Sequence, residues 1–317
     1  MEAPLAGRVA LVAGATRGAG RGIACMLGEA GATVYATGRS TREQGATPSR
    51  PETIQATAEM VSTRGGRRIA LRVDHTMPDQ VETLLARIEA DEGRLDLLVN
   101  DVWGGDALTE FGTPFWKLSL ENGRTLLERA VFSHVVTARH AAPLLMRTGN
   151  GLIVEITDCD SYQYRGNLFY DLVKTSVIRL AFDFARELRR HGVSAVALTP
   201  GFLRSEAMLE RFGVTEASWR DAVAKDPHFA ASETPFFVGR AVAALAADPA
   251  VSRMSGRVLS SWALSDEYGF ADMDGSRPHW GRYAEATFGA GISRSCDDAF
   301  YDYWRGGPID ALWPDWP

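Results

Sequence analysis

The chain has 317 residues, of which 45% are hydrophobic and 23% are charged, proportions typical of a soluble globular protein. The formal net charge of −6 argues against general binding to nucleic acid or to anionic membranes. Apolar runs are shorter than the roughly 20 residues of a membrane span, and the amino terminus lacks the basic region of a secretory signal. Three cysteines without a CxxC motif argue against a disulfide framework or a metal site. We therefore expect a cytoplasmic protein without a bound metal.

Apolar strand-like runs alternate with helical patterns along most of the chain. Expected strands are residues 8–13, 33–37, 69–73, 95–99, 152–156, 194–198 and 257–261. Expected helices are residues 23–30, 52–64, 78–92, 126–146, 169–191 and 235–247. This alternation predicts an α/β fold with a doubly wound, Rossmann-type parallel sheet of about seven strands and helices on both faces. Ligands of such sheets bind at the carboxyl ends of the strands.

The last fifty residues differ in composition from the rest of the chain. They are rich in Trp, Tyr, Asp and Gly, and their periodicity is weak. We expect residues 1–264 to form the dinucleotide-binding and catalytic domain. Residues 265–317 are expected to pack on that domain as a lid, an oligomer contact or a surface wrap.

A glycine-rich turn follows the first expected strand. Gly14, Gly18 and Gly20 would let the backbone approach a pyrophosphate, while the next helix points its N–H donors at the phosphates. Arg17 lies within this turn, and Arg39 follows the second strand, where NAD-binding proteins usually carry an acidic residue. Two guanidinium groups suit a 2′-phosphate, which favours NADP(H) over NAD(H). The alternative is a pair of solvated arginines.

The segment from Gly151 to Lys174 carries the predicted chemistry. It begins as an apolar strand, reaches Thr157, and continues into a helix that presents Tyr170 and Lys174 four residues apart. With eight tyrosines and three lysines in the chain, a chance Tyr-x-x-x-Lys has an expectation of roughly 8%. A nearby ammonium would lower the pKa of Tyr170. Tyr170 could then exchange a proton with a carbonyl oxygen that the Thr157 hydroxyl holds.

These motifs together resemble the short-chain dehydrogenase/reductase family over roughly Arg8 to Leu264. The matching segments are AGATRGAG at 13–20, TGR at 37–39, VD at 73–74, YDLVK at 170–174 and PGFLRS at 200–205. ELRRHGVSAVALTPG and EYGFADMDG are most similar to the branch around dehydrogenase/reductase member 1. The resemblance implies that the nicotinamide cofactor contacts the glycine turn, the ends of later strands and the Tyr/Lys pair: Gly14, Thr16, Arg17, Gly18, Ala19, Gly20, Arg39, Asp74, His75, Asn100, Tyr170, Lys174, Pro200, Gly201, Leu203 and Ser205.

The chain departs from the family pattern at several positions near the expected site. Thr157 stands at the catalytic serine, and Asp158 replaces the second serine of the usual pair. Where the family usually has Asn-Asn-Ala-Gly, this chain has Asn-Asp-Val-Trp-Gly, which places Asp101 and Trp103 in that segment. Ala130 stands where an Asn often supports the proton relay. The expected substrate pocket includes Trp103, Asp158 and Asp160.

Three hypotheses follow. The first is an NADP(H)-dependent oxidoreductase that interconverts a small-molecule carbonyl and an alcohol, with Tyr170 as general acid/base. The second is a non-redox cyclase, dehydratase or epimerase on the same scaffold, and the third is a non-catalytic cofactor-binding protein. By resemblance, a homodimer or homotetramer is expected, with no nucleic-acid or membrane partner.

Overall fold

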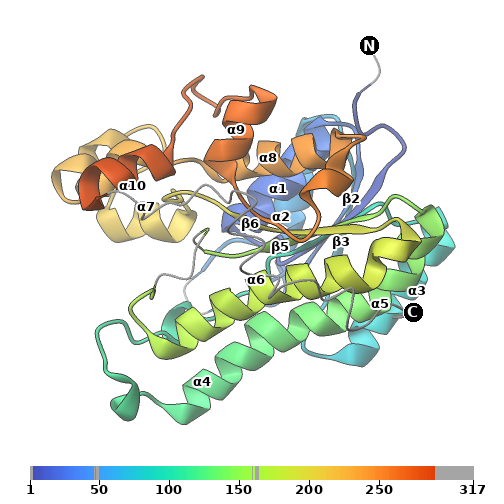
Figure 1. Cartoon of the computed structure of the whole chain (residues 1–317), viewed down its shortest axis with the longest axis horizontal. Coiled ribbons are helices and arrows are strands. Elements are labelled where there is room, and N and C mark those ends of the chain that lie inside the picture. Colours follow the sequence, from blue (N-terminus) through green and yellow to red (C-terminus); the bar gives the residue numbers. More distant parts are fainter. Residues whose placement is uncertain (1–2, 46, 48–49, 159, 161–163, 290–317) are drawn as a thin grey trace, which may run out of the picture.

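The computed structural model describes residues 3–45, 47, 50–158, 160 and 164–289. A parallel sheet lies at its centre, with strand order β3-β2-β1-β4-β5-β6-β7 (Figure 1). The strands are β1 Val9–Ala13, β2 Thr33–Gly38, β3 Arg67–Arg72, β4 Leu97–Asn100, β5 Leu152–Ile156, β6 Ser194–Thr199 and β7 Val258–Ser260. The predicted fold class is confirmed.

The helices connect these strands and cover both faces of the sheet. They are α1 Gly18–Glu29, α2 Ile54–Thr63, α3 Pro78–Glu92, α4 Leu120–Leu127, α5 Ser133–Thr148, α6 Leu168–Leu188, α7 Glu206–Phe212, α8 Pro235–Ala247, α9 Ser261–Tyr268 and α10 Trp280–Phe288. Apolar residues of α1, α2 and α8 pack on one face of the sheet. Those of α3, α5 and α6 pack on the other (Figure 1).

Small residues permit the close packing of α1 against α8. A Cβ added to Gly22 would lie 1.9 Å from the carbonyl oxygen of Pro235, and one added to Gly239 would lie 2.5 Å from the carbonyl oxygen of Gly22. Glycine at these positions therefore lets two helix backbones touch. This contact places the amino terminus of α1 beside the segment that precedes α8.

The order of the strands reverses between β1 and β4. β1 pairs with β2 on one side and with β4 on the other, and all three run parallel. Their carboxyl ends therefore leave a crevice at this point, which is where ligands of such sheets bind. The glycine turn after β1 and Asn100 at the end of β4 both lie there.

Several regions differ from the sequence-based expectation: α1 begins at Gly18 instead of Ile23, and α7 was not expected. The single helix expected over 126–146 starts at Leu120 and contains a π-helical turn, Glu128–Phe132, between α4 and α5. The carboxy-terminal region contains α9 and α10, which its weak periodicity did not predict, and the expected domain boundary at residue 264 falls inside α9. Within the described ranges, no helix combines the length and apolarity needed to cross a bilayer.

Candidate active site

The turn between β1 and α1 is shaped by glycine. Gly14 has φ of +94°, and a Cβ there would lie 2.3 Å from the carbonyl oxygen of Asp101. At the end of β2, a Cβ on Gly38 would lie 2.5 Å from the Thr16 hydroxyl oxygen. The turn can therefore lie directly against the ends of β2 and β4. Arg17 is the N-cap residue of α1 and makes no side-chain cap, so the first N–H groups of the helix are available to an anion.

An anionic group of the protein already lies at this helix terminus. Oε2 of Glu206, the first residue of α7, accepts a hydrogen bond of 2.8 Å from the Gly18 N–H. Its Oε1 accepts one of 2.9 Å from the Arg21 guanidinium. A carboxylate therefore lies at the amino terminus of α1, a place that favours anions.

The two arginines expected at a 2′-phosphate both have acidic neighbours. Nε of Arg17 lies 3.3 Å from Glu52, yet its Nε and Nη2 are buried without a hydrogen bond. Burial lowers the pKa of Arg17 despite the opposing charge of Glu52. Nη1 of Arg39 lies 3.7 Å from Asp74, and the Arg39 side chain is 30% exposed. Both guanidinium groups therefore have donor capacity for a further anion.

Asp74 and His75, at the end of the third strand, have different environments. Burial opposes ionisation of Asp74, but hydrogen bonds from the hydroxyl and backbone N–H of Thr76 lower its pKa. The His75 ring is buried between the hydroxyls of Thr37 and Thr137, at 2.8 and 2.9 Å. Burial lowers the pKa of His75 to about 3. The neutral His75 ring thus joins β2 to α5.

The three predicted catalytic residues lie together in the structure. Thr157 directly follows β5, whereas Tyr170 and Lys174 lie in the first turns of α6. The N-cap Asn167 accepts a hydrogen bond of 3.1 Å from the Tyr170 N–H and so starts the helix at this point. The Thr157 hydroxyl donates to the carbonyl oxygen of Lys174 at 2.8 Å. This hydrogen bond holds the end of β5 against α6 beside Tyr170 and Lys174.

The phenol of Tyr170 does not have the environment that the sequence suggested. Its hydroxyl donates a hydrogen bond of 2.7 Å to Oδ2 of Asp158. Burial, together with the charge of this carboxylate, raises the pKa of Tyr170. The expectation that Lys174 lowers this pKa is therefore wrong for this structure. Burial lowers the pKa of Lys174 itself, and the carboxylates of Asp158 and Asp101 oppose that shift.

Aromatic side chains surround the Tyr/Lys pair. The rings of Trp103 and Phe111 each contact the Tyr170 ring edge to face, with centroids 5.3 Å apart. The Lys174 ammonium lies 4.7 Å from the centroid of the Trp103 ring, a cation–π contact. The Trp103 indole N–H donates to Asp106 at 2.6 Å. Trp103 therefore lies at the predicted site. No sequence pattern pointed to Phe111, which belongs to an irregular loop.

A buried polar cluster at the ends of β4 and β5 was not foreseen. Glu155 lies fully buried within β5 and accepts hydrogen bonds of 2.6 Å from both the Asn100 amide and Nδ1 of His134. A carboxylate inside an apolar strand was the available signal, because such a group requires buried partners. Asn100 thus joins the two strands, and its own Oδ1 is buried without a partner.

Asp101, the residue after Asn100, lies between the glycine turn and Lys174 and interacts with both. Its carboxylate accepts a hydrogen bond from the backbone of Gly20. Burial raises the pKa of Asp101 to about 7, against the opposing charge of Lys174. The substitution of Asp for the family's Asn therefore adds a titratable group beside the lysine.

The segment Pro200 to Ser205 follows β6 and packs against Glu233. Oε2 of Glu233 accepts hydrogen bonds from the Gly201 N–H at 2.9 Å and from the Ser261 hydroxyl at 2.6 Å. Leu203 forms a parallel bridge with Glu233. Burial raises the pKa of Glu233 to about 8, and its Oε1 has no hydrogen-bond partner.

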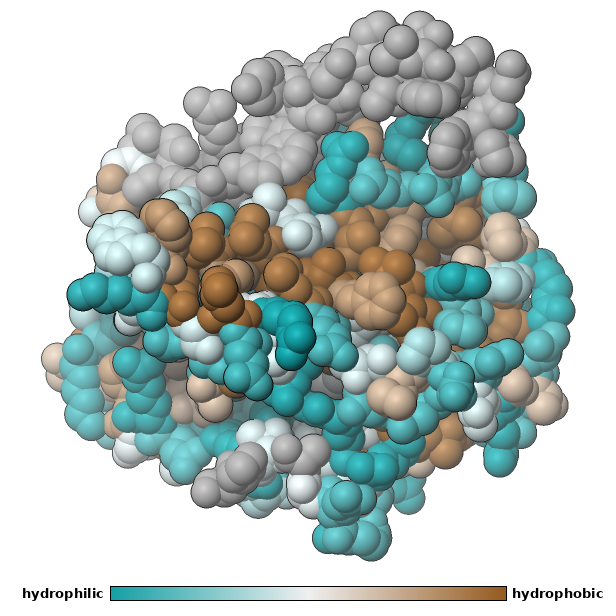
Figure 2. Space-filling model, turned by 90° about the horizontal axis from the view of Figure 1, so that it is seen from below, coloured by the Kyte–Doolittle hydropathy of each residue, from teal (hydrophilic) through white to brown (hydrophobic). Residues whose placement is uncertain are grey.

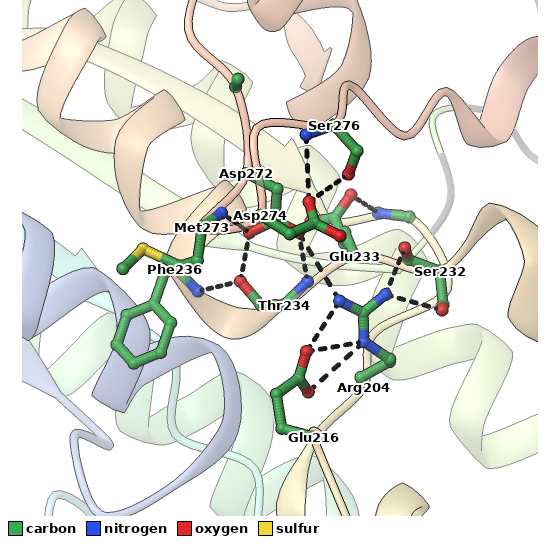
Figure 3. A network of polar contacts seen from close by, with 12 residues as sticks. Arg204, Glu216, Ser232, Glu233, Thr234, Phe236, Asp272, Met273, Asp274 and Ser276 are labelled. Atoms are coloured by element: carbon green, nitrogen blue, oxygen red, sulfur yellow. Dashed lines mark hydrogen bonds and ion pairs between the residues drawn. The ribbon is translucent and has the colours of Figure 1, made fainter. Parts of the chain in front are cut away.

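Figure 3 shows how this segment is tied to the carboxy-terminal region. The Arg204 guanidinium lies between Ser232, Glu216 and Asp272, donating to the Ser232 carbonyl oxygen at 2.7 Å and to Glu216 at 2.9 Å. Asp272 accepts from the Thr234 N–H at 2.8 Å. The predicted cofactor loop therefore depends on residues beyond 264 for its position.

Asp160 was expected in the substrate pocket. It is buried and lines a cavity of about 460 Å³ together with residues of β7, α9 and α10. The lining of that cavity includes neither Tyr170 nor Lys174.

Comparison with known proteins agrees with this architecture. A family model for short chain dehydrogenases matches residues 8–212. Dehydrogenase/reductase SDR family member 1 of Mus musculus is 37% identical over 280 residues, covering 87% of this chain and 86% of that protein. The Homo sapiens protein of that name is 36% identical over the same shares. The 3-oxoacyl-[acyl-carrier-protein] reductase FabG of Escherichia coli is 28% identical over 210 residues, covering 63% of this chain and 75% of that protein.

Solved structures show the same fold. A putative dehydrogenase from Xanthomonas campestris has a TM-score of 0.70 at 22% identity, covering 87% of this chain and 94% of its own. A short chain dehydrogenase from Mycobacterium paratuberculosis bound to NAD has a TM-score of 0.64 at 21% identity, covering 81% of this chain and 97% of its own.

The parallel sheet, the glycine turn at its switch point and the Tyr/Lys pair beside β5 define a Rossmann-type oxidoreductase fold. The chain belongs to the short-chain dehydrogenase/reductase family, in the branch that resembles family member 1.

Proposed function

We propose that the protein is an NADP(H)-dependent oxidoreductase that interconverts a carbonyl and an alcohol, with Tyr170 as general acid/base. The observation that carries this proposal is the convergence of Thr157, Tyr170 and Lys174 beside the switch point of the sheet. A bound nicotinamide would supply or accept the hydride. The reductase named among the relatives, from Escherichia coli, supports a carbonyl as one partner of the reaction.

The residues of the crevice fit a phosphorylated dinucleotide. The amino terminus of α1 already holds the carboxylate of Glu206, which shows its preference for an anion. Arg17 and Arg39 support a 2′-phosphate, because a partly buried guanidinium with unused donors can bind a phosphate through two hydrogen bonds. The catalytic segment would then hold the nicotinamide end through Lys174 and the loop from Pro200 to Ser205.

The proposed chemistry assigns a separate task to each side chain. The Thr157 hydroxyl, now bonded to a backbone carbonyl, would turn to the substrate oxygen. Tyr170 would donate a proton to that oxygen in reduction or take one in oxidation. Trp103 and Phe111 would form an apolar wall that favours flat substrates and keeps water from the Tyr170 phenol.

Parallel titrations with NADPH and NADH, followed by reduced-nicotinamide fluorescence, test the cofactor preference. Arg39→Gln should weaken NADPH binding by about 10- to 100-fold, since a hydrogen bond to a charged group contributes about 1.5–3 kcal/mol. NADH binding should stay unchanged. Arg42→Gln is the matched control, because Arg42 is exposed and pairs with Glu59. Tighter binding of NADH than NADPH by the wild-type protein would contradict the cofactor assignment.

Reduction of acetophenone with NADPH tests the assignment of Tyr170. Tyr170→Phe should lower kcat by about 10²- to 10⁴-fold while NADPH binding persists. Tyr164→Phe is the control, because Tyr164 is 68% exposed. Undiminished turnover in Tyr170→Phe would remove Tyr170 from this role. Conversion of a substrate without net consumption of NADPH would instead favour the non-redox alternative.

We also propose self-association of the chain as a homodimer or homotetramer. Exposed apolar side chains support it: Leu120 on α4 is 78% exposed, Phe132 of the π-helical turn 55% and Leu172 on α6 43%. These helices lie on the side of the molecule seen in Figure 2, where apolar residues form a broad band. Sedimentation equilibrium would measure the state, and a monomer at micromolar concentration would refute the proposal.

A further inference from the structure

The hydrogen bond between Tyr170 and Asp158 places a second titratable group at the reacting atoms. The phenol donates to Oδ2 of Asp158 at 2.7 Å, a short, charge-assisted contact. Asp158 directly follows Thr157 at the end of β5. Its backbone carbonyl accepts a hydrogen bond of 2.7 Å from Nε of Arg165, which holds the loop in this position.

This contact changes what Tyr170 can do alone. A tyrosinate beside a carboxylate would place two negative charges within hydrogen-bond distance, and the phenol is already stabilised by burial and by that carboxylate. Tyr170 therefore cannot act as an isolated base at neutral pH. It can accept a proton on its oxygen only if its own proton leaves at the same time.

Asp158 is placed to take that proton. The neighbouring π-helical turn contributes Ala130 at the position where family members often carry a polar relay residue, and its methyl group has no exchangeable proton. Oδ2 of Asp158, in contrast, already holds the Tyr170 hydroxyl. Asp158 is also partly exposed to solvent, so a proton that it accepts can pass to water.

We propose that Asp158 is a catalytic residue and the terminal base of a Tyr170–Asp158 relay; this rests on the proposed function. In alcohol oxidation, the carbinol carbon loses a hydride to an oxidised nicotinamide dinucleotide. The substrate O–H bond breaks as its proton moves to the Tyr170 oxygen. The Tyr170 proton moves in turn to Oδ2 of Asp158, which becomes a neutral carboxylic acid. Reduction runs these transfers backwards and begins with the protonated acid.

Several charged groups face this pair and would act on the relay. Arg165, on the loop before α6, and Lys174, on α6, are cationic. The charge of Arg165 lowers the pKa of Tyr170, whereas that of Asp106, from the loop after β4, raises it. The charge of Asp101 raises the pKa of Lys174, and that of Arg165 lowers it. Asp171 is paired with Arg165 at 3.2 Å. Oxidation by the proposed relay requires Asp158 in its ionised form.

The first test needs no substrate. Protein labelled with ¹³Cζ-tyrosine should show one resonance, absent from Tyr170→Phe, that shifts with pH as the bonded carboxyl group ionises. Asp158→Asn should abolish that pH dependence, because an amide does not titrate. Asp183→Asn is the control. Asp183 lies on α6, the helix that carries Tyr170, but pairs with Arg179 at 3.1 Å near the surface. A Tyr170 resonance without an acid-range shift in the wild-type protein would overturn the proposal.

The second test follows oxidation of 1-phenylethanol with NADP⁺ across pH. The relay predicts that the wild-type kcat for oxidation falls as acid protonates its terminal base, whereas acetophenone reduction becomes faster. Asp158→Asn should lower kcat for oxidation by about 10²- to 10⁴-fold, and Asp158→Glu should restore part of it. NADPH binding in each variant reports correct folding, and Asp158→Ser provides a second neutral variant.

The two proposals fail in distinguishable ways. If Tyr170→Phe retains turnover, the proposed function of Tyr170 fails. If Tyr170→Phe is inactive while Asp158→Asn keeps the wild-type kcat and pH profile, only the relay fails.

Discussion

Glu206 is expected to compete with the cofactor for the amino terminus of α1. Its carboxylate holds the Gly18 N–H and the Arg21 guanidinium, at 2.8 and 2.9 Å. A bound pyrophosphate would need the same donors, so Glu206 must turn away when the cofactor binds. Glu206→Gln keeps the shape and the acceptor oxygen of the side chain but removes its charge. The variant should therefore bind NADPH more tightly than the wild-type protein does.

The size of this effect follows from Coulomb's law. Two unit charges about 4 Å apart interact by about 1 kcal/mol in water. The Glu206 side chain is only 27% exposed in its contact with α1. Because it must turn away from the helix when the pyrophosphate binds, the value for water is the appropriate one for the remaining repulsion. Removal of its repulsion with a doubly charged pyrophosphate should contribute about 1–2 kcal/mol, which corresponds to a roughly 5- to 30-fold lower Kd. Salt should reduce the difference, because it screens charges near the surface.

Fluorescence titration of both proteins with NADPH at low and high salt measures the change. Glu210→Gln is the matched control: Glu210 lies one turn further along α7, pairs with Arg50, and is 70% exposed. An unchanged or raised Kd in Glu206→Gln would show that this carboxylate does not occupy the phosphate position. The loss of the ion pair with Arg21 should cost no more than about 1 kcal/mol of folding stability.

Three further predictions concern stability. Burial raises the pKa of Glu233 from 4.5 to about 8, so the native state binds the proton more tightly than the unfolded state does, and stability falls as the pH rises through this window. Glu233→Gln should therefore flatten the pH dependence in urea denaturation between these values; an unchanged slope would contradict the burial argument. Gly22→Ala should lower the free energy of unfolding in urea by about 1–3 kcal/mol or more, because its Cβ would lie 1.9 Å from the Pro235 carbonyl oxygen. Gly45→Ala is the control and should be nearly neutral, because there is open space around Gly45. Glu155→Ala should cost about 3–5 kcal/mol in the same assay, since it leaves a buried imidazole and amide without their shared acceptor; a loss below about 1 kcal/mol would show that the cluster reorganises at little cost.

Local patterns were sufficient to predict the fold and to place Tyr170 and Lys174 at one candidate site. The apolar positions Val81, Leu84, Leu85 and Ile88 recur at helical spacing, and they all face the core in α3. The four-residue spacing of Tyr170 and Lys174 places them on one face of α6, independently of how the rest of the chain folds. The glycines between the first apolar strand and the next helix similarly predict a tight turn at that point. These features depend on residues close together in the sequence, and resemblance to a known family reinforced them.

The partners of these residues were decided by the tertiary structure. Gly18 and Glu206 are 188 positions apart, and no local pattern relates them. Glu155 meets His134 and Asn100 only because β4, β5 and α5 pack together. Burial of the phenol and the carboxylate of Asp158 raise the pKa of Tyr170, the opposite of the shift expected from Lys174. The sequence therefore determined which chemical groups the site contains. The fold determined their electrostatics, since charge interactions depend on distance and burial, and both are set by contacts between segments remote in the chain.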